Sequence, residues 1–192
     1  MKQSYNPNRH HRRSIRLRGW DYTTPGAYFV TICTYQRENL FDHAVFRKVG
    51  ENAWRAIPTH VHAQHVTLDE WVLMPNHLHG ILVINESDDG WGEATGKDVP
   101  NASGRSLPVA SPLRPGSIGA IVGNFKSLVT RRINNLRRTP GGRVWQRGYY
   151  DRIVRNERAL NAIRQYVRDN PARWAEDRDN LDVLLSNMRL VA

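Results

Sequence analysis

The 192-residue sequence has little of several features that define specialised classes of protein. Its single cysteine, Cys33, excludes an internal disulfide and fits a reducing compartment. Its longest apolar runs, such as residues 80–84, fall far short of the ~20 residues that cross a bilayer. No apolar stretch follows the charged N-terminus, as a secretory signal would require. We therefore expect a cytoplasmic protein with no membrane partner.

Acidic residues are also scarce relative to basic ones. The chain has 28 Lys and Arg against 18 Asp and Glu, which gives a formal net charge of +10 and an isoelectric point near 10.3. The excess lies in residues 1–20 and 118–158, whereas residues 86–101 are acidic. Because most of the basic residues are arginines, whose planar guanidinium suits phosphate, the charge favours a nucleic-acid partner over a generally basic surface.

The order of apolar patterns predicts an α+β domain, with β-branched and aromatic runs as strands and apolar residues at helical spacing as helices. The expected elements are a strand at 28–35, a helix at 42–57, strands at 66–74 and 77–84 separated by a turn at Pro75-Asn76, a helix at 118–136, a strand at 144–154 and a helix between Asn156 and Pro171. Strand, helix, strand, repeated twice, predicts a ferredoxin-like fold (split β-α-β). Its four-stranded antiparallel sheet would carry helices on one face, with an additional C-terminal helix.

Two of the expected helices have a stripe of apolar residues that predicts which side they bury. The first stripe consists of Val45, Val49, Ala53, Trp54 and Ile57. The second follows Ser117, a good N-cap, and consists of Ile118, Ile121, Val122, Phe125, Leu128, Val129, Ile133 and Leu136.

The chain is expected to form one domain with two extensions. We assign a basic N-terminal arm to residues 1–22, the domain to residues 23–174 and a C-terminal tail to residues 175–192. Residues 86–117 are rich in acidic residues, Gly, Ser and Pro, and are interpreted as an exposed insertion within the domain. Too little sequence lies on either side of this insertion to form two separate cores.

Two histidines at the start of the third expected strand, His77 and His79, form the candidate metal site. Side chains at i and i+2 of a strand point to the same face, so both imidazoles project together and can hold one metal ion. His60 and His62, followed by His65, form a second pattern of this kind. We favour His77 and His79 because they lie in an apolar run that must be ordered; the alternative is that they are half-buried histidines satisfied by backbone groups.

Tyr166 and Asn170 lie four residues apart on the last expected helix and so share one of its faces. Asn170 directly precedes Pro171, at the carbonyl end of the helix, where a cation is favoured, and its amide oxygen is a candidate third metal ligand. The hydroxyl of Tyr166 would then lie one turn away, a geometry that suits nucleophilic attack. The alternative is a tyrosine that packs at the edge of the core.

Several motifs in this order resemble a known family. They are MPNHLHG at residues 74–80, VWQRGYYD at 144–151 and YVRDNP at 166–171, together with RSIRLRGWDY at 13–22, GAYFVT at 26–31 and FKSLVTR at 125–131. This set resembles the single-tyrosine transposases of the HUH endonuclease superfamily. Among these it is most similar to the REP-associated tyrosine transposases, which bind and cut palindromic repeats in bacterial genomes.

The resemblance implies an activity and a role for each candidate residue. It implies a metal-dependent single-stranded DNA endonuclease and strand transferase that acts near palindromic repeat hairpins, with His77 and His79 as ligands of Mg²⁺ or Mn²⁺. Tyr166 would be the nucleophile and would form a 5′-phosphotyrosine intermediate. Asn170 stands where related transposases often have Gln. The alternatives are a DNA-hairpin-binding protein without activity and a two-histidine hydrolase that uses water.

The basic segments supply the candidate DNA contacts. Phosphate contacts of Lys and Arg give salt-dependent affinity without sequence choice. The candidates are Arg12, Arg13 and Arg16 in the arm, and Lys126, Arg131, Arg132, Arg147 and Arg152 in the domain. The expected partner is single-stranded or hairpin DNA, which implies a nucleoid-associated protein. A homodimer is also considered, because related transposases can donate the tyrosine helix across a dimer interface.

Overall fold

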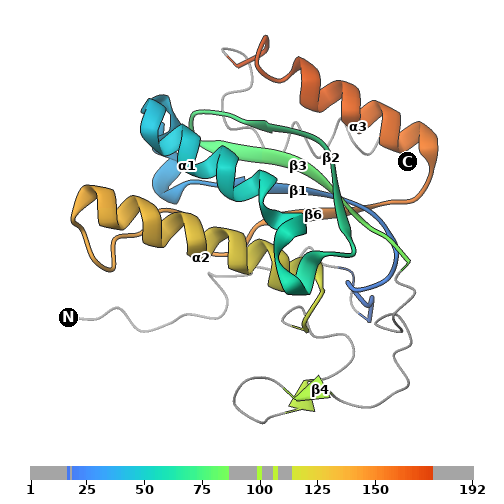
Figure 1. Ribbon diagram of the computed structural model, residues 1–192. Coiled ribbons are helices and arrows are strands. Elements are labelled where there is room, and N and C mark those ends of the chain that lie inside the picture. Colours follow the sequence, from blue (N-terminus) through green and yellow to red (C-terminus); the bar gives the residue numbers. More distant parts are fainter. Residues whose placement is uncertain (1–16, 18, 87–98, 101–105, 108–113, 175–192) are drawn as a thin grey trace, which may run out of the picture.

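The computed structural model describes residues 17, 19–86, 99–100, 106–107 and 114–174 (Figure 1). The C-terminal tail, most of the N-terminal arm with Arg12, Arg13 and Arg16, and much of the expected insertion lie outside the described residues. No helix in the described ranges is long and apolar enough to cross a membrane.

Four strands and three helices form the body of the molecule, with short 3₁₀ turns between them. The strands are β1 (Gly26–Cys33), β2 (Val66–Leu73), β3 (His77–Ile84) and β6 (Tyr150–Val154), and the helices are α1 (Ala44–Arg55), α2 (Ile118–Arg137) and α3 (Glu157–Asp169). The 3₁₀ turns are η1 (Tyr35–Arg37), η2 (Leu40–Asp42), η3 (Ile57–Thr59) and η4 (Val61–Ala63), and a separate two-stranded pair is formed by β4 (Val99–Pro100) and β5 (Ser106–Leu107).

The sheet has the order β2-β3-β1-β6, and every neighbouring pair is antiparallel. The first and third strands of the β-α-β-β-α-β order are central, and the second and fourth are at the edges, as in a split β-α-β fold. The predicted fold class is confirmed. Helices α1 and α2 cover one face of the sheet, and α3, the additional C-terminal helix, covers the opposite face (Figure 1).

The face covered by α1 and α2 contains the main hydrophobic core. Trp54 of α1 is fully buried there and meets Phe125 of α2 edge to face, with ring centroids 5.2 Å apart. A Cβ atom on Gly80 of β3 would overlap the Trp54 ring, so only glycine fits beneath it. Because burying one large apolar side chain contributes roughly 1.5–3 kcal/mol, this face supplies most of the stabilising burial.

The face covered by α3 has a much smaller core. Phe29 of β1 and Ile81 of β3 pack with Ile163 and Val167 of α3, and these are the four buried apolar residues of this cluster. The polar residues Thr31, His77 and His79 are buried on the same face of the strands. On β1 and β3, the face that α3 covers therefore carries both apolar packing residues and buried polar residues.

The predicted helix ends are confirmed by their caps. The Ser117 side chain accepts a hydrogen bond from the backbone N–H of Ala120, and the Asn156 side chain accepts one from Ala159. Helix α3 ends at Asp169, before Pro171, because proline cannot continue the hydrogen-bond ladder.

The last strand is shorter than predicted. Residues 150–154 form β6. Before them, Trp145 forms an isolated antiparallel bridge with Thr34, the residue that directly follows β1. Gly148 has a φ of +82°, which interrupts an extended chain between the two segments. Aromatic residues on both sides of this glycine produced a strand-like pattern that the backbone does not follow.

Three other expectations about exposure were wrong. Val45 and Leu136, placed on apolar stripes, are 48% and 54% exposed, because each lies near a helix end beyond the reach of the core. The end of the expected insertion is packed against the domain: Ser117 is buried, and Arg114 is buried in an ion pair with Asp21 at 3.1 Å.

Candidate active site

His77 and His79 lie side by side on the face of β3 that α3 covers. Their ring centroids are 4.4 Å apart, and each residue is only 3% exposed. Leu78 between them is fully buried in the opposite core. The predicted alternation is confirmed, and it places two imidazoles together on a rigid central strand.

Each imidazole is oriented through its Nδ1 atom. His77 Nδ1 donates a hydrogen bond to the amide oxygen of Asn76 at 2.7 Å. His79 Nδ1 shares a hydrogen bond of 2.8 Å with the hydroxyl of Thr31, its cross-strand partner on β1. With both Nδ1 atoms engaged, the Nε2 atoms are the ones directed away from the backbone and suited to bind a ligand.

Tyr166 brings its hydroxyl to the same place from α3. The hydroxyl oxygen lies 3.2 Å from His79 Nε2, and the two ring centroids are 5.3 Å apart. Phe29 of β1 stacks on His79 at 5.5 Å and meets the Tyr166 ring edge-on at 6.3 Å. The tyrosine is therefore held against the histidine pair by an aromatic contact as well as by its hydroxyl.

Asn170 is the third candidate ligand from the sequence prediction. It is 1% exposed and lies four residues after Tyr166, which contacts His79, and four before Trp174, whose ring is 5.7 Å from His77. The Oδ1 atom of Asn170 is itself buried.

The pKa of His79 lies well below its usual value of 6.5. Burial is the main cause, since it disfavours the charged imidazolium, and the neighbouring His77 and Arg37 add electrostatic repulsion. His79 is therefore neutral at physiological pH. A neutral imidazole is the form that binds a metal ion.

The residues present fit a divalent metal with a limited set of donors. Two imidazoles and one amide oxygen are chemically suitable ligands, and Mn²⁺ accepts imidazole more readily than Mg²⁺ does. Within the described ranges, no group of three or more His, Cys, Asp or Glu side chains could hold a metal ion. A metal held by these three donors alone would have further positions for water or substrate oxygens.

The alternative histidines occupy a different region. His62 is exposed in η4, and His65 Nε2 lies 3.2 Å from the carbonyl oxygen of Gly116. His60 and His62 line a cavity of about 550 Å³ between the end of α1 and the start of α2, on the other side of the sheet from Tyr166. The structure does not bring them together with the candidate nucleophile.

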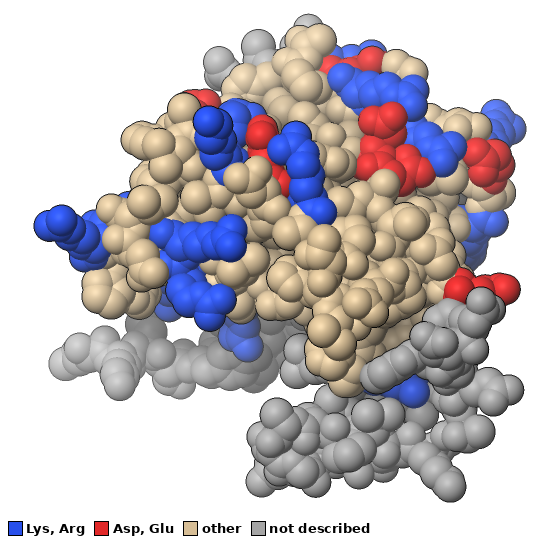
Figure 2. Space-filling view, in the orientation of Figure 1, with Lys and Arg blue, Asp and Glu red and all other residues tan. Residues whose placement is uncertain are grey.

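The predicted DNA contacts in the domain are placed on several elements. Arg131 and Arg132 are exposed on α2, Arg147 is exposed before β6, and Arg152 is half-buried on β6. Figure 2 shows Lys and Arg side chains gathered on the left of the molecule, over the C-terminal part of α2. Their contact with DNA stays a prediction.

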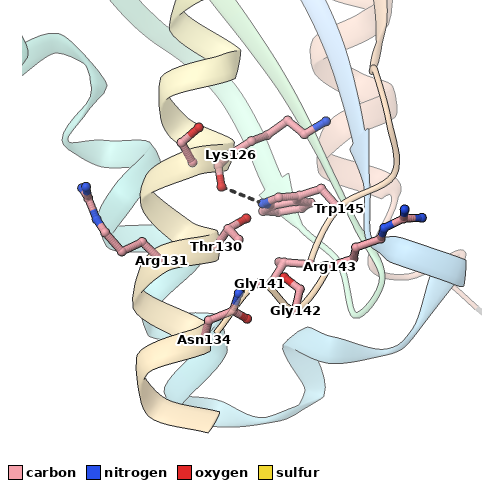
Figure 3. A pocket seen from close by; sticks show the side chains of 10 residues that line it. Lys126, Thr130, Arg131, Asn134, Gly141, Gly142, Arg143 and Trp145 are labelled. Carbon is pink, nitrogen blue, oxygen red and sulfur yellow. Dashed lines mark hydrogen bonds between the residues drawn. The ribbon is translucent and has the colours of Figure 1, made fainter. Parts of the chain in front are cut away.

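Lys126 has a structural role in addition to any contact with DNA. Its amine donates hydrogen bonds to the carbonyl oxygens of Gln146 and Gly148, at 2.8 and 2.7 Å. The Trp145 indole donates to the Lys126 carbonyl, and together these bonds tie the segment before β6 to α2. An open pocket of about 490 Å³ lies between α2 and this segment, and Arg131 and Arg143 point away from its centre (Figure 3).

Two residues of the site, Thr31 and Asn76, were missed by the sequence analysis. Thr31 lies 48 residues from His79, and only the register of β1 on β3 brings the two together. Asn76 was interpreted as a turn residue alone, although its position directly before His77 could have indicated a hydrogen-bond acceptor for that ring.

Comparison with known proteins shows a family and a fold. The chain is 35% identical over 190 residues to an uncharacterized protein of Haemophilus influenzae, and the alignment covers 95% of this chain and 100% of that protein. The chain therefore belongs to the same family as this protein. No family model matches the chain.

Among solved structures, a similar fold is seen in a REP-associated tyrosine transposase bound to a REP hairpin. The TM-score is 0.52, the sequence identity is 17%, and the superposition covers 83% of this chain and 74% of that chain. The chain has the fold of this transposase.

Proposed function

We propose that this protein is a transposase-like DNA-processing enzyme, a metal-dependent single-stranded DNA endonuclease and strand transferase. The observation that carries the proposal is the approach of the Tyr166 hydroxyl to within 3.2 Å of Nε2 of the buried His79, with His77 beside it. A nucleophile next to a pair of metal-binding groups is what covalent cleavage of a phosphodiester requires. The shared fold with a transposase bound to a REP hairpin supports DNA hairpins as the substrate.

His77 and His79, with Asn170 as a third donor, would hold Mg²⁺ or Mn²⁺. When bound, such an ion polarises the scissile phosphate and orients its oxygens. Thr31 and Asn76 keep the two Nε2 atoms available by engaging the Nδ1 atoms. Because His79 Nε2 is also the partner of the Tyr166 hydroxyl, binding of a metal by this nitrogen would require the hydroxyl to give up that hydrogen bond.

Tyr166 then acts as the nucleophile. Its phenolic oxygen bonds to the phosphorus, and the bond between the phosphorus and the 3′ oxygen breaks. The phenol loses one proton and the departing 3′ oxygen gains one, which leaves a 5′-phosphotyrosine and a free 3′-hydroxyl. A phenolate, with a pKa near 10 in its parent phenol, is also a better leaving group than an alkoxide, so a 3′-hydroxyl can reverse the step without ATP.

The proposal is tested by trapping the intermediate. The protein is incubated with a 5′- or 3′-labelled single-stranded hairpin DNA and Mn²⁺, denatured and resolved on a gel. We expect a covalent protein–DNA band that carries the label 3′ to the cut. Tyr166→Phe should abolish this band, because phenylalanine has no oxygen to attack with, while Tyr35→Phe, which keeps its ring contact with Arg143, should leave it unchanged.

The other outcomes separate the alternatives. Cleavage without an adduct would indicate a hydrolase that uses water. DNA binding without cleavage across varied hairpins would indicate a binding protein. An adduct that persists in Tyr166→Phe would overturn the assignment of the nucleophile.

A further inference from the structure

Helix α3 presents Tyr166 to the histidines but is held on the sheet by a narrow apolar contact. Ile163 and Val167 of the helix are buried in the small core, and Leu160 and Tyr166 are partly buried beside them; the small side chain of Ala159 is also buried. A single stripe of this kind fixes how close a helix lies to a sheet better than it fixes rotation of the helix about its own axis. Something else has to set that rotation.

A β-bulge in β2 places two carboxylates in front of α3. The register of β2 on β3 shifts between Leu68 and Trp71, so that Asp69 and Glu70 together oppose a single residue of β3. In a regular strand, two successive side chains would point to opposite faces. The bulge instead lets both carboxylates reach the helix.

Two arginines one turn apart on α3 receive these carboxylates. Arg164 binds Asp69 through Nε, at 3.0 and 3.1 Å to the two oxygens, and through Nη2 at 2.6 Å. Arg168 binds one oxygen of Glu70 through Nε and Nη2, at 2.9 and 2.7 Å. Contact with Arg164 is also the main reason why the pKa of Asp69 is lowered. We call these four residues the α3 clamp.

The α3 clamp and Tyr166 lie on opposite flanks of the helix. At 3.6 residues per turn, positions 164 and 168 project from one side, positions 163 and 167 face the sheet, and position 166 projects from the other side. This arrangement matches the contacts: the arginines reach the edge strand β2, while Tyr166 reaches His79 and Phe29 on the central strands.

We propose that the α3 clamp sets the rotation of α3 and so positions the Tyr166 hydroxyl at the histidine pair. This inference rests on the proposed function for its effect on the reaction. Asp69, Glu70, Arg164 and Arg168 are positioning residues in it, because they touch neither the histidines nor the tyrosine in the contacts described.

The expected effect of the α3 clamp is on rate rather than on stability. Ion pairs between partly exposed side chains contribute little to folding, and the Arg168 side chain is 54% exposed. A tyrosine hydroxyl, however, lies far outside the ~2.3 Å radius of the helix backbone, so a small rotation of the helix displaces it strongly. Misplacing a reacting atom by about 1 Å can lower a rate on the order of a hundredfold.

The test uses Asp69→Asn in the full chain, with Glu51→Gln as the matched control. Glu51 pairs with Arg55 on α1, over the other face, and its substitution changes the net charge equally. We expect Asp69→Asn to slow formation of the covalent adduct about tenfold or more at saturating hairpin DNA, with hairpin affinity and the urea midpoint close to those of the unaltered protein. Glu51→Gln should change none of these quantities.

A second measurement is independent of the reaction. The nuclear Overhauser effect between the ring protons of Tyr166 and His79 reports their contact directly, without DNA or metal. It should weaken in Asp69→Asn and persist in Glu51→Gln. The charge-exchanged pair Asp69→Arg with Arg164→Asp should restore part of both the contact and the rate.

The outcomes also separate this inference from the proposed function. An unchanged Overhauser effect and an unchanged rate in folded Asp69→Asn would overturn the role of the α3 clamp while the adduct itself stands. If the unaltered protein forms no adduct, the proposed function fails, and the Overhauser comparison still decides whether the α3 clamp holds the contact. If Asp69→Asn does not fold, Arg168→Gln, which removes the more exposed ion pair, replaces it. We then expect smaller decreases in the rate of adduct formation and in the Overhauser effect between Tyr166 and His79.

Discussion

The two faces of the central sheet bury different kinds of residue, although they share the same strands. The face under α1 and α2 is packed with aromatic and aliphatic side chains around Trp54. The face under α3 buries two histidines, a threonine and an asparagine next to a core of four apolar residues. In β3, neighbouring residues such as His79 and Gly80 serve opposite faces. Stability and candidate chemistry are therefore separated by the thickness of one sheet, and substitutions can address each side alone.

The largest effect is expected on the α3 face. Replacing both histidines, His77→Ala with His79→Ala, should lower the rate of Mn²⁺-dependent adduct formation a thousandfold or more, because a metal ion contributes several kcal/mol to the stabilisation of transition-state charge. The rate is measured on denaturing gels, and Mn²⁺ binding by titration calorimetry. A double variant that still forms the adduct at the normal rate would remove the histidines from the chemistry.

The complementary experiment addresses the face under α1 and α2. Trp54→Ala should lower the free energy of unfolding by about 3–5 kcal/mol, because a fully buried aromatic ring is replaced by a cavity. Urea denaturation measures the change. Under conditions where the variant is folded, its affinity for Mn²⁺ should stay within about threefold of the original, and a parallel loss of Mn²⁺ binding would contradict the separation of the two faces.

A smaller effect is expected from the residues that orient the histidines. Thr31→Val removes the hydroxyl that engages His79 Nδ1, and loss of such a partner commonly costs about 10–100-fold in metal affinity. Calorimetric titration with Mn²⁺ measures it. The control is Thr67→Val, an exposed threonine on β2. Equal affinities for both variants would mean that Thr31 does not orient the ligand.

The smallest effect is a dependence of stability on pH. The pKa of His79 is lowered in the folded protein, so between that value and about 6.5 the unfolded chain binds a proton that the folded chain does not. The free energy of unfolding should therefore decrease as the pH falls below about 6.5, by at most about 1.4 kcal/mol per pH unit for this one group, and His79 should contribute no slope above it.

Comparison with His79→Gln isolates this contribution, because the other histidines affect both proteins alike. As the pH is lowered from 7 to 5, the urea midpoint of the metal-free unaltered protein should fall relative to that of the metal-free variant. Parallel curves would show that His79 titrates normally.

The sequence predicted the elements well where local patterns decide them. Runs of β-branched and aromatic residues predicted the strands, and the alternation of side chains along a strand predicted the shared orientation of His77 and His79. The caps at Ser117 and Asn156 predicted where two helices begin. The strand at 144–154 was predicted too long, because its aromatic residues suit a strand and only the backbone at Gly148 shows the interruption. The local pattern of residue types does not predict such a dihedral angle.

Features that depend on pairing between distant segments could not be predicted. An apolar stripe on α3 indicates that the helix packs, but it does not indicate which face of the sheet the helix covers. The partnership of Thr31 with His79 depends on the register of β1 against β3. The ion pair of Asp69 with Arg164 spans 95 residues and depends on a bulge that the sequence does not mark.

The close fit of Gly80 beneath Trp54 couples these two positions of the α1 and α2 face during evolution. Any side chain at position 80 would collide with the indole, so a relative that has a larger residue there needs a smaller one at position 54. The two positions should therefore change together among homologues, on the side of the sheet away from the histidines. Such a paired change would let a family member rebuild its core while the neighbouring positions 77 and 79 keep their register and their direction.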